Sequence, residues 1–419
     1  MQPAKRLSHL NEALYLIFLT GLVCSFRAVC SISIALIIVA GIVKNKLETK
    51  SFFHRNLRHA FFTSCLLLFV IHIIALAWTQ NSKQGWTNIV LTSGLLFTPL
   101  AISCTNYNNT FTREKILSRY CLMLALACLY CLCKACVYYF QSGDPSHFFY
   151  HALVSPFDHH AVYFSILVFI ALVFLTEGLV KNSLFFRRPV YIVLVIFLSV
   201  FLFLLSSKLV IIFYGLYLVY LFILLIKKRT GSRVLMISSF LVLIVISCLT
   251  LFIRNPISNR FYDLFNGNIS IIKQEKFDPG NYFNGLQFRL LQWKFTGEIL
   301  NETNRWWYGV SPGDAQALID QKYISTKMYT GNPEKGTKGF LGYNTHNEFL
   351  ETLLQSGIAG LVVLLAICVS LLKIARQKRR RALTAVILLL LAWLFTESVF
   401  ERQFGIMIFT FFPLFLSFD

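Results

Sequence analysis

Residues 190–226 read VYIVLVIFLSVFLFLLSSKLVIIFYGLYLVYLFILLI, which is two apolar runs divided by Ser206-Ser207-Lys208. Each run has the length and composition of a helix that crosses, or nearly crosses, the hydrocarbon core of a bilayer. Backbone N–H and C=O groups in lipid must be satisfied within their own segment, so both runs are predicted to be helical. The stretch therefore predicts an integral membrane protein.

The composition of the whole chain supports this prediction. Of 419 residues, 56% are hydrophobic and only 14% are charged, which is not typical of a soluble protein. The 39 basic and 19 acidic residues give a net charge of +20, but most of the basic residues lie in short loops between apolar runs and do not form one nucleic-acid-binding face. The 11 cysteines lie in or beside apolar segments, which excludes a secreted disulfide scaffold.

A window of about 19 residues detects twelve apolar stretches along the chain. They lie at 11–27, 28–43, 60–78, 85–103, 119–140, 161–177, 190–206, 208–226, 234–253, 348–372, 382–396 and 399–418. The first two are divided at Arg27, because a charged side chain is costly in hydrocarbon and fits a turn between two helices. We therefore predict an all-α integral membrane protein with about 12 transmembrane helices.

The positions of lysine and arginine predict the orientation of these spans. Lys5 and Arg6 precede the first span, and further basic clusters follow the even-numbered spans, within 44–58, 113–119, 181–188, 227–233 and 373–381. The loop at 142–160 contains neither lysine nor arginine. By the positive-inside rule, both termini are cytoplasmic and the long polar segment 254–347 is outside.

This orientation divides the chain into three parts. Residues 1–253 hold spans one to nine, residues 254–347 form a partly helical periplasmic loop, and residues 348–419 hold spans ten to twelve. Within the loop, Leu286, Leu290, Trp293 and Leu300 recur at helical spacing. They predict an amphipathic helix along the membrane surface, with Arg289 on its flank. On residue statistics alone, an ordinary solvated or phospholipid-contacting arginine is the favoured interpretation of Arg289.

The end of the loop carries a candidate base. Thr345 and Glu348 have the spacing of a capping box, which predicts that His346 lies in the first turn of the helix entering span ten. The amide dipoles at a helix N-terminus disfavour the imidazolium, so the ring is expected to be neutral, as a general base requires. Packing or capping at the interface is the alternative role.

Other polar groups lie at the same predicted membrane face. Lys208 is either a functional cation or a lysine that reaches the headgroups. Asp158, His159 and His160 carry metal-ligating side chains, but three adjacent residues do not converge on one ion with good geometry, so no metal site is predicted. The cysteines between 128 and 136 are interpreted as packing residues. Lys134 among them is an intramembrane cation of undetermined role.

Several motifs together resemble the bacterial O-antigen ligase and O-antigen polymerase superfamily. These GT-C-like membrane glycosyltransferases use undecaprenyl-diphosphate-linked glycans. The similar segments are Ser206-Ser207-Lys208, Gly285 to Lys294 with Arg289, Tyr308 to Asp314, Asn344 to Glu351 with His346, and Thr396 to Gly405. Their order, with a large outer loop between spans nine and ten, is more specific than any one of them.

The resemblance implies a reaction and roles for its residues. A glycan moves from undecaprenyl diphosphate to a hydroxyl of lipid A–core oligosaccharide, by a metal-independent inverting mechanism that needs no cofactor. His346 is the general base, and Arg289 and Lys208 stabilise the diphosphate. Substrate contacts are expected from Arg260, Tyr343, Asn344, Asn347, His160, Glu397 and Arg402. The implied location is the bacterial inner membrane, among membrane lipids, with the site facing the periplasm and no nucleic-acid partner.

Three alternatives stay open. A polymerase has the same chemistry but uses the end of another lipid-linked repeat as acceptor. An oligosaccharyltransferase with a protein acceptor is a second alternative. A transporter of lipid-linked glycan or anionic solute, with Lys134, Lys208 and Arg289 along its pathway, belongs to a different class. The outer loop interrupts any repeat of two halves, which argues against the transporter.

Overall fold

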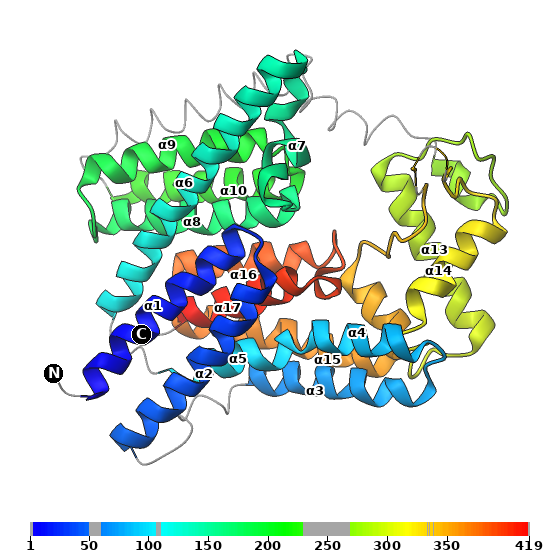
Figure 1. Cartoon of the computed structure of the whole chain (residues 1–419), viewed down its shortest axis with the longest axis horizontal. Helices are drawn as coiled ribbons and strands as arrows, with labels where there is room; N and C mark the ends of the chain where they lie inside the picture. Colours follow the sequence, from blue (N-terminus) through cyan, green and yellow to red (C-terminus); the bar gives the residue numbers. More distant parts are fainter. Residues whose placement is uncertain are drawn as a thin grey trace.

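The computed structural model describes most of the chain as helices (Figure 1). The described residues are 3–49, 60–105, 110–228, 269–332, 334, 336, 337 and 339–417. The predicted span 234–253, the candidate Arg260 and parts of the basic loops 44–58 and 227–233 lie outside them. Within the described residues no strand forms, apart from an isolated antiparallel bridge between Asn332 and Thr337.

Helices cover the other predicted apolar stretches. The first group is α1 (Pro3–Val23), α2 (Arg27–Thr49), α3 (Ala60–Ala75), α4 (Ser82–Thr92), α5 (Gly94–Cys104) and α6 (Thr110–Ser142). The second group is α7 (Tyr150–Val154), α8 (Ala161–Lys181), α9 (Arg188–Leu204), α10 (Lys208–Lys228), α15 (Glu348–Lys378), α16 (Arg381–Trp393) and α17 (Gln403–Ser417). Arg27 is the first residue of α2, after a turn in which Ser25 has a φ of 60°. The predicted break at Arg27 is confirmed.

The prediction of about twelve spans is confirmed only in part. Six helical segments have the length and composition to cross a membrane, namely Arg27–Leu47, Ala60–Trp78, Ser82–Cys104, Thr112–Ser142, Ala161–Lys181 and Glu348–Lys378. The other apolar segments, among them His9–Val23 of α1 and Lys208–Leu224 of α10, have 10–17 residues. Many large apolar side chains on these helices are exposed, among them Val90, Leu126 and Val193, as expected for surfaces that contact lipid tails. The fold is that of an all-helical, membrane-embedded protein.

Residues 269–347, which we call the outer segment after their predicted orientation, contribute to a separate apolar core. The outer segment contains η5 (Ile269–Lys273), α13 (Gly285–Thr303) and α14 (Ala315–Ser325). Phe288, Leu291 and Phe295 of α13 pack with other buried residues of this segment and with Leu354 near the start of α15. Figure 1 shows α13 and α14 at one end of the molecule, beyond the ends of α3, α4 and α15. The outer core therefore joins this segment to the membrane helices.

Helix α15 is interrupted near its start. Gly357 has φ 64° and ψ −164°, which is not helical. The backbone around it pairs with the outer segment instead: Val310 N donates to Leu354 O at 2.8 Å, and Ile358 N donates to Trp306 O at 2.8 Å. This pairing fixes the outer segment on α15. The interruption also separates the first turns of α15, which carry site residues, from the longer part of the helix.

Candidate active site

Arg289 lies in the second turn of α13, whose start is strongly specified by the sequence. The side chain of Asn284 accepts hydrogen bonds from Leu286 N at 3.1 Å and Gln287 N at 2.9 Å, and Gln287 Oε1 accepts from Asn284 N at 2.8 Å. This reciprocal arrangement is a capping box. The predicted helix after Gly285 is confirmed, and Arg289 is placed by a well-defined helix start.

The buried face of α13 differs from the predicted one. The buried apolar residues are Phe288, Leu291, Phe295, Ile299 and Leu300, whereas Leu286, Leu290 and Trp293 are only partly buried. The spacing detected the helix, but leucine and tryptophan also occur on its partly exposed side. The main apolar contacts of α13 are thus with the outer core. Arg289, next to Phe288, borders this core with 31% of its side chain exposed.

His346 lies just before α15 and not in its first turn. Asn347 is the N-cap, and its side chain accepts hydrogen bonds from Phe349 N at 3.0 Å and Leu350 N at 3.2 Å. His346 has a φ of 47°, in the left-handed region. The predicted position in the first turn is therefore wrong by two residues, because asparagine is the capping side chain.

The predicted capping box of Thr345 and Glu348 is also wrong. The carboxylate of Glu348 accepts from Phe400 N at 2.8 Å and from Thr352 Oγ1 at 3.0 Å. The hydroxyl of Thr345 instead lies 2.8 Å from Glu351 Oε2. Both acids of the first turn are thus used to hold other segments.

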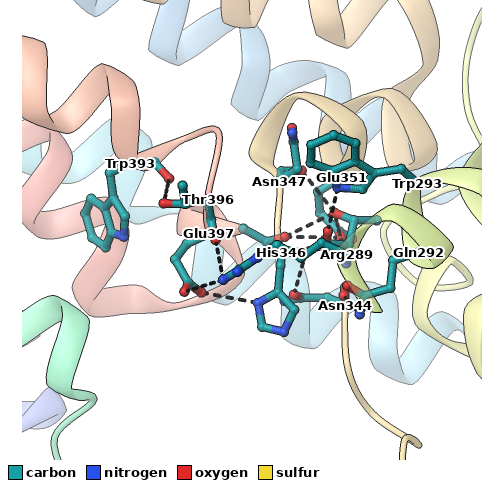
Figure 2. Close-up of polar contacts among 12 residues, drawn as sticks. Arg289, Gln292, Trp293, Asn344, His346, Asn347, Glu351, Trp393, Thr396 and Glu397 are labelled. Carbon is teal, nitrogen blue, oxygen red and sulfur yellow. Dashed lines mark hydrogen bonds and ion pairs between the residues drawn. The ribbon is translucent and has the colours of Figure 1, made fainter. Parts of the chain in front are cut away.

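Glu397 joins the two principal candidates. Its Oε2 atom lies 3.3 Å from His346 Nδ1, and its Oε1 atom lies 3.6 Å from the Nη2 atom of Arg289. Figure 2 shows the carboxylate reaching both side chains from the loop after α16. Its expected role in substrate contact stays a prediction, and these contacts with His346 and Arg289 are additional to it. His346, Glu397 and Arg289, which we call the central triad, come from three distant parts of the sequence.

The carboxylate of Glu397 is held in its charged form. Burial raises its pKa, but the hydrogen bond from His346 and then the positive charge of Arg289 lower that pKa below its ordinary value. An ionised carboxylate only accepts hydrogen bonds, so Nδ1 of His346 must be the donor. Nε2 is then the basic nitrogen, and the ring points it away from Glu397 (Figure 2).

Arg289 makes one further contact in this group. Its Nη2 atom donates to the carbonyl of Thr396 at 3.2 Å, while its Nε atom is buried without a hydrogen-bond partner in the described residues. The guanidinium therefore fixes the loop that carries Glu397 and retains N–H groups that are not used by protein. Such a planar fork matches the oxygens of a phosphate.

Lys208 is the first residue of α10 and is half-buried. Ser206, with a φ of 51°, forms the turn that separates it from α9. Within the described part of the chain, the hydrogen bonds and ion pairs of the central triad do not include Lys208. The structure thus brings together two of the three predicted catalytic residues.

His160 and Arg402 both contact the ring of Tyr163. The rings of His160 and Tyr163 are 5.2 Å apart, and the guanidinium of Arg402 lies 5.8 Å from the Tyr163 ring. Burial lowers the pKa of His160 to about 3, although the charge of Glu397 acts in the opposite direction. His160 is therefore a neutral ring beside the charged carboxylate, and its Nδ1 atom is buried without a partner in the described residues.

The remaining predicted contact residues surround His346. The ring of Tyr343 lies 5.9 Å from the ring of His346 and is 47% exposed. Asn344 accepts from His346 N at 3.2 Å through its side chain, and its carbonyl accepts from the Gln292 side chain. Asn344 and Asn347 thus hold the loop, whereas Tyr343 has a surface that can stack on a sugar.

The structure gives the histidines near α8 structural contacts. Nε2 of His159 lies 3.0 Å from Leu22 O, and its Nδ1 atom lies 3.3 Å from His160 O. Among the described residues, no group of three or more His, Cys, Asp or Glu side chains is arranged to hold a metal ion. On α6, Cys128 and Cys131 are buried as expected, but Cys133 and Cys136 are exposed.

Two contributors to this site were not predicted from the sequence. Glu351 accepts hydrogen bonds from the residue before His346 and from the residue after Glu397. Trp293 donates from Nε1 to Thr345 O at 3.2 Å. Glu351 has a weak signal, an acid one helical turn after Asn347, which is also typical of an ordinary helix start.

Comparison with known proteins found a match to one family model. Residues 193–365 match a family model described as O-antigen ligase. The match includes Lys208, Arg289 and His346, and ends before Glu397. No curated protein matches the chain. This domain match, together with the apolar helices, supports membership of the O-antigen ligase superfamily and a ligase- or polymerase-like membrane glycosyltransferase.

Proposed function

We propose that the chain transfers a glycan from undecaprenyl diphosphate to a hydroxyl of lipid A–core oligosaccharide, at the periplasmic face of a bacterial inner membrane. The observation that carries this proposal is the central triad. It places a histidine with a basic Nε2 beside a carboxylate and an arginine with unused N–H groups. A base and a phosphate-binding cation are the two groups that this reaction requires.

In the proposed reaction, Nε2 of His346 takes the proton of the acceptor hydroxyl. The acceptor oxygen attacks the anomeric carbon as the bond from that carbon to the diphosphate oxygen breaks. One in-line displacement inverts the configuration and releases undecaprenyl diphosphate. Glu397 holds Nδ1 of His346 and stabilises the imidazolium that forms.

Negative charge develops on the diphosphate as it leaves. Arg289 supplies a fixed positive charge with a planar fork, and we propose Lys208 as a second, point-like charge. These side chains perform the role that a divalent cation has in other glycosyltransferases, so the proposed mechanism is metal-independent.

The test is transfer in proteoliposomes that contain undecaprenyl-diphosphate oligosaccharide and lipid A–core acceptor. Wild type should form the glycosylated acceptor, in chelator as well as without it, and His346→Ala should lower the rate by about 10²–10⁴-fold while donor binding persists. His147→Ala is the control. His147 lies in the short helical turn Pro145–Phe148, away from the central triad in the sequence, and its ring contacts the hydroxyl of Ser142.

The outcomes separate the alternatives. Elongation of the donor glycan without the lipid acceptor indicates a polymerase with the same chemistry. Loss of activity in chelator contradicts the metal-independent mechanism. A third outcome is movement of the donor across the bilayer without glycan transfer, at the same rate in wild type and His346→Ala. That result indicates a transporter and contradicts the proposed enzyme activity.

A further inference from the structure

Glu351 is a buried carboxylate beneath the central triad, with 3% of its surface exposed. Its Oε2 atom accepts from Thr345 N at 3.1 Å, from Thr345 Oγ1 at 2.8 Å and from Ser398 Oγ at 3.4 Å. Its Oε1 atom accepts from Gln355 Nε2 at 2.8 Å. One carboxylate therefore binds the residue that precedes His346 and the residue that follows Glu397 (Figure 2 shows Glu351 beside this group).

The loop that carries His346 depends on this anchor. His346 lies outside α15, in left-handed backbone, and its ring is 24% exposed. Thr345, in contrast, is fully buried. Glu351 accepts from its N–H and hydroxyl, and Trp293 Nε1 donates to its carbonyl. The orientation of His346 thus follows from how Thr345 is held.

The loop that carries Glu397 reaches the same anchor from the other side. Ser398 is buried, and its hydroxyl lies 3.2 Å from the hydroxyl of Thr345 as well as within reach of Glu351. Thr345, Ser398 and Glu351 form a closed triangle of polar contacts, in which each hydroxyl has one proton to donate, and the hydroxyl of Thr345 also lies 3.0 Å from Asn347 O. Thr345 precedes His346 in the chain, and Ser398 follows Glu397. The triangle therefore lies next to the 3.3 Å contact between His346 and Glu397.

We infer that Glu351 is a positioning residue, which sets the separation of His346 and Glu397 and thereby the orientation of the catalytic base. This inference rests on the proposed function for its effect on catalysis. Its structural part does not, because the separation of two loops can be measured without any transfer reaction. A shift of about 1 Å at a reacting group costs on the order of 10²-fold in rate, so the expected effect is large.

The first measurement is independent of chemistry. His346→Cys and Glu397→Cys are introduced together, and cross-linking of the two new thiols by a short bis-methanethiosulfonate reagent is quantified by peptide mass spectrometry. A spanning reagent is used because the 3.3 Å contact joins the far ends of two side chains, whereas a direct disulfide needs β-carbons about 3.5–4.5 Å apart. Adding Glu351→Ala should lower the yield several-fold, because Thr345 and Ser398 lose their common acceptor. Adding Glu177→Ala is the matched control. Glu177 is also a buried carboxylate, paired with Lys181 and Arg381 at the far end of α8.

The second measurement uses transfer by the otherwise unmodified chain. Glu351→Ala should lower kcat by about 10–100-fold and change KM for the donor by less than about twofold, since the diphosphate-binding cation is retained. Glu351→Gln, which keeps one acceptor oxygen, should recover part of kcat. In the double variant with Glu397→Gln, the losses of kcat from the two substitutions should be less than additive, because both act through the position of His346.

Smaller changes keep the inference testable if Glu351→Ala does not fold. Thr345→Val and Ser398→Ala each remove one side of the triangle and should each lower cross-linking and kcat. An unchanged cross-linking yield in these variants, or equal losses in the Glu177→Ala control, overturns the positioning role. If wild type shows no transfer but cross-linking falls as expected, the proposed function fails and the positioning of the two loops stands.

Discussion

His346 Nδ1 lies 3.3 Å from Oε2 of Glu397, a residue 51 positions further along the chain. The contact joins the loop before α15 to the loop after α16. It assigns the proton to Nδ1, because the carboxylate can only accept, and leaves Nε2 as the nitrogen that we propose takes the proton of an acceptor hydroxyl. Arg289, whose Nη2 atom is 3.6 Å from the same carboxylate, connects this base to the helix that we propose for binding diphosphate.

Replacing the linking carboxylate should weaken catalysis without removing the base. Glu397→Gln keeps the shape of the side chain but loses the charge that stabilises an imidazolium, so kcat should fall by about 10²-fold. The pKa of Glu397 is lowered, so its charge is present at neutral pH and lost only in strong acid. Any change of kcat between about pH 5.5 and 8 therefore belongs to other groups and should persist in Glu397→Gln.

Glu302→Gln is the control for this variant, since Glu302 is an acid of α13 with 63% of its side chain exposed. Equal kcat for Glu397→Gln and Glu302→Gln in the transfer assay would show that the contact with His346 has no catalytic role.

Arg289 should be sensitive to the shape of its cation as well as to its charge. Arg289→Ala is expected to lower kcat by about 10²–10³-fold, which is typical for loss of a group that stabilises developing charge. Arg289→Lys keeps the positive charge but not the planar fork, so its kcat should lie between the values for wild type and Arg289→Ala. The measurement is kcat and KM for the lipid-linked donor.

The control for the arginine series is Arg305→Ala. Arg305 lies just beyond the end of α13, with its guanidinium 4.8 Å from the centre of the Tyr308 ring. An equal decrease of kcat in Arg289→Ala, Arg289→Lys and Arg305→Ala would contradict a specific role of Arg289. It would indicate a general effect of arginine side chains near the membrane.

The sequence predicted the helices well because the bilayer imposes a simple rule on them. A long apolar run must be helical in lipid, and a charge such as Arg27 interrupts it. The interruption of α15 at Gly357 was not predicted, since a hydropathy window detects composition and not backbone angles. That interruption depends on pairing with Trp306 to Ser311, a contact between segments that sequence periodicity does not report.

The site was predicted by residue type but not by arrangement. Arg289 and His346 were identified because the motifs that carry them resemble those of the O-antigen ligase superfamily and because their side chains suit a phosphate and a proton. Glu397 was expected to contact substrate, and its contact with both of them requires two loops to meet in space. Glu351 was not identified because its role comes from a buried triangle of polar contacts with Thr345 and Ser398. Lys208 as a participant stays a prediction.

The carboxylate of Glu401 should make stability depend on pH. Burial, and then the negative charge of Glu351, raise its pKa from 4.5 to about 7. A raised pKa means that the folded state holds the proton more tightly, so the contribution is complete below pH 4.5 and is lost as the pH rises through 7. Relative to Glu401→Gln, the Tm of wild type in detergent should fall by about 2–5 °C between pH 5 and pH 8.

Glu302→Gln serves again as the control, because its exposed carboxylate should leave the pH dependence of Tm as it is in wild type. A wild-type Tm that tracks the Tm of Glu401→Gln across this range would show that Glu401 does not bind a proton in the folded protein near neutral pH.

The interruption of α15 should require glycine. Gly357 has a φ of 64° and a ψ of −164°, a conformation that costs other residues about 1–3 kcal/mol, and a Cβ atom there would collide with the backbone of Trp307 and Tyr308. Gly357→Ala should therefore lower Tm by several degrees, and it should also lower kcat because the first turns of α15 hold Glu351. Gly215→Ala, in α10 with no atom within 4 Å of the added Cβ, should leave both unchanged. Tm is measured by thermal unfolding in detergent. Equal Tm values for Gly357→Ala and Gly215→Ala would mean that the backbone pairing at Gly357 does not stabilise the outer segment.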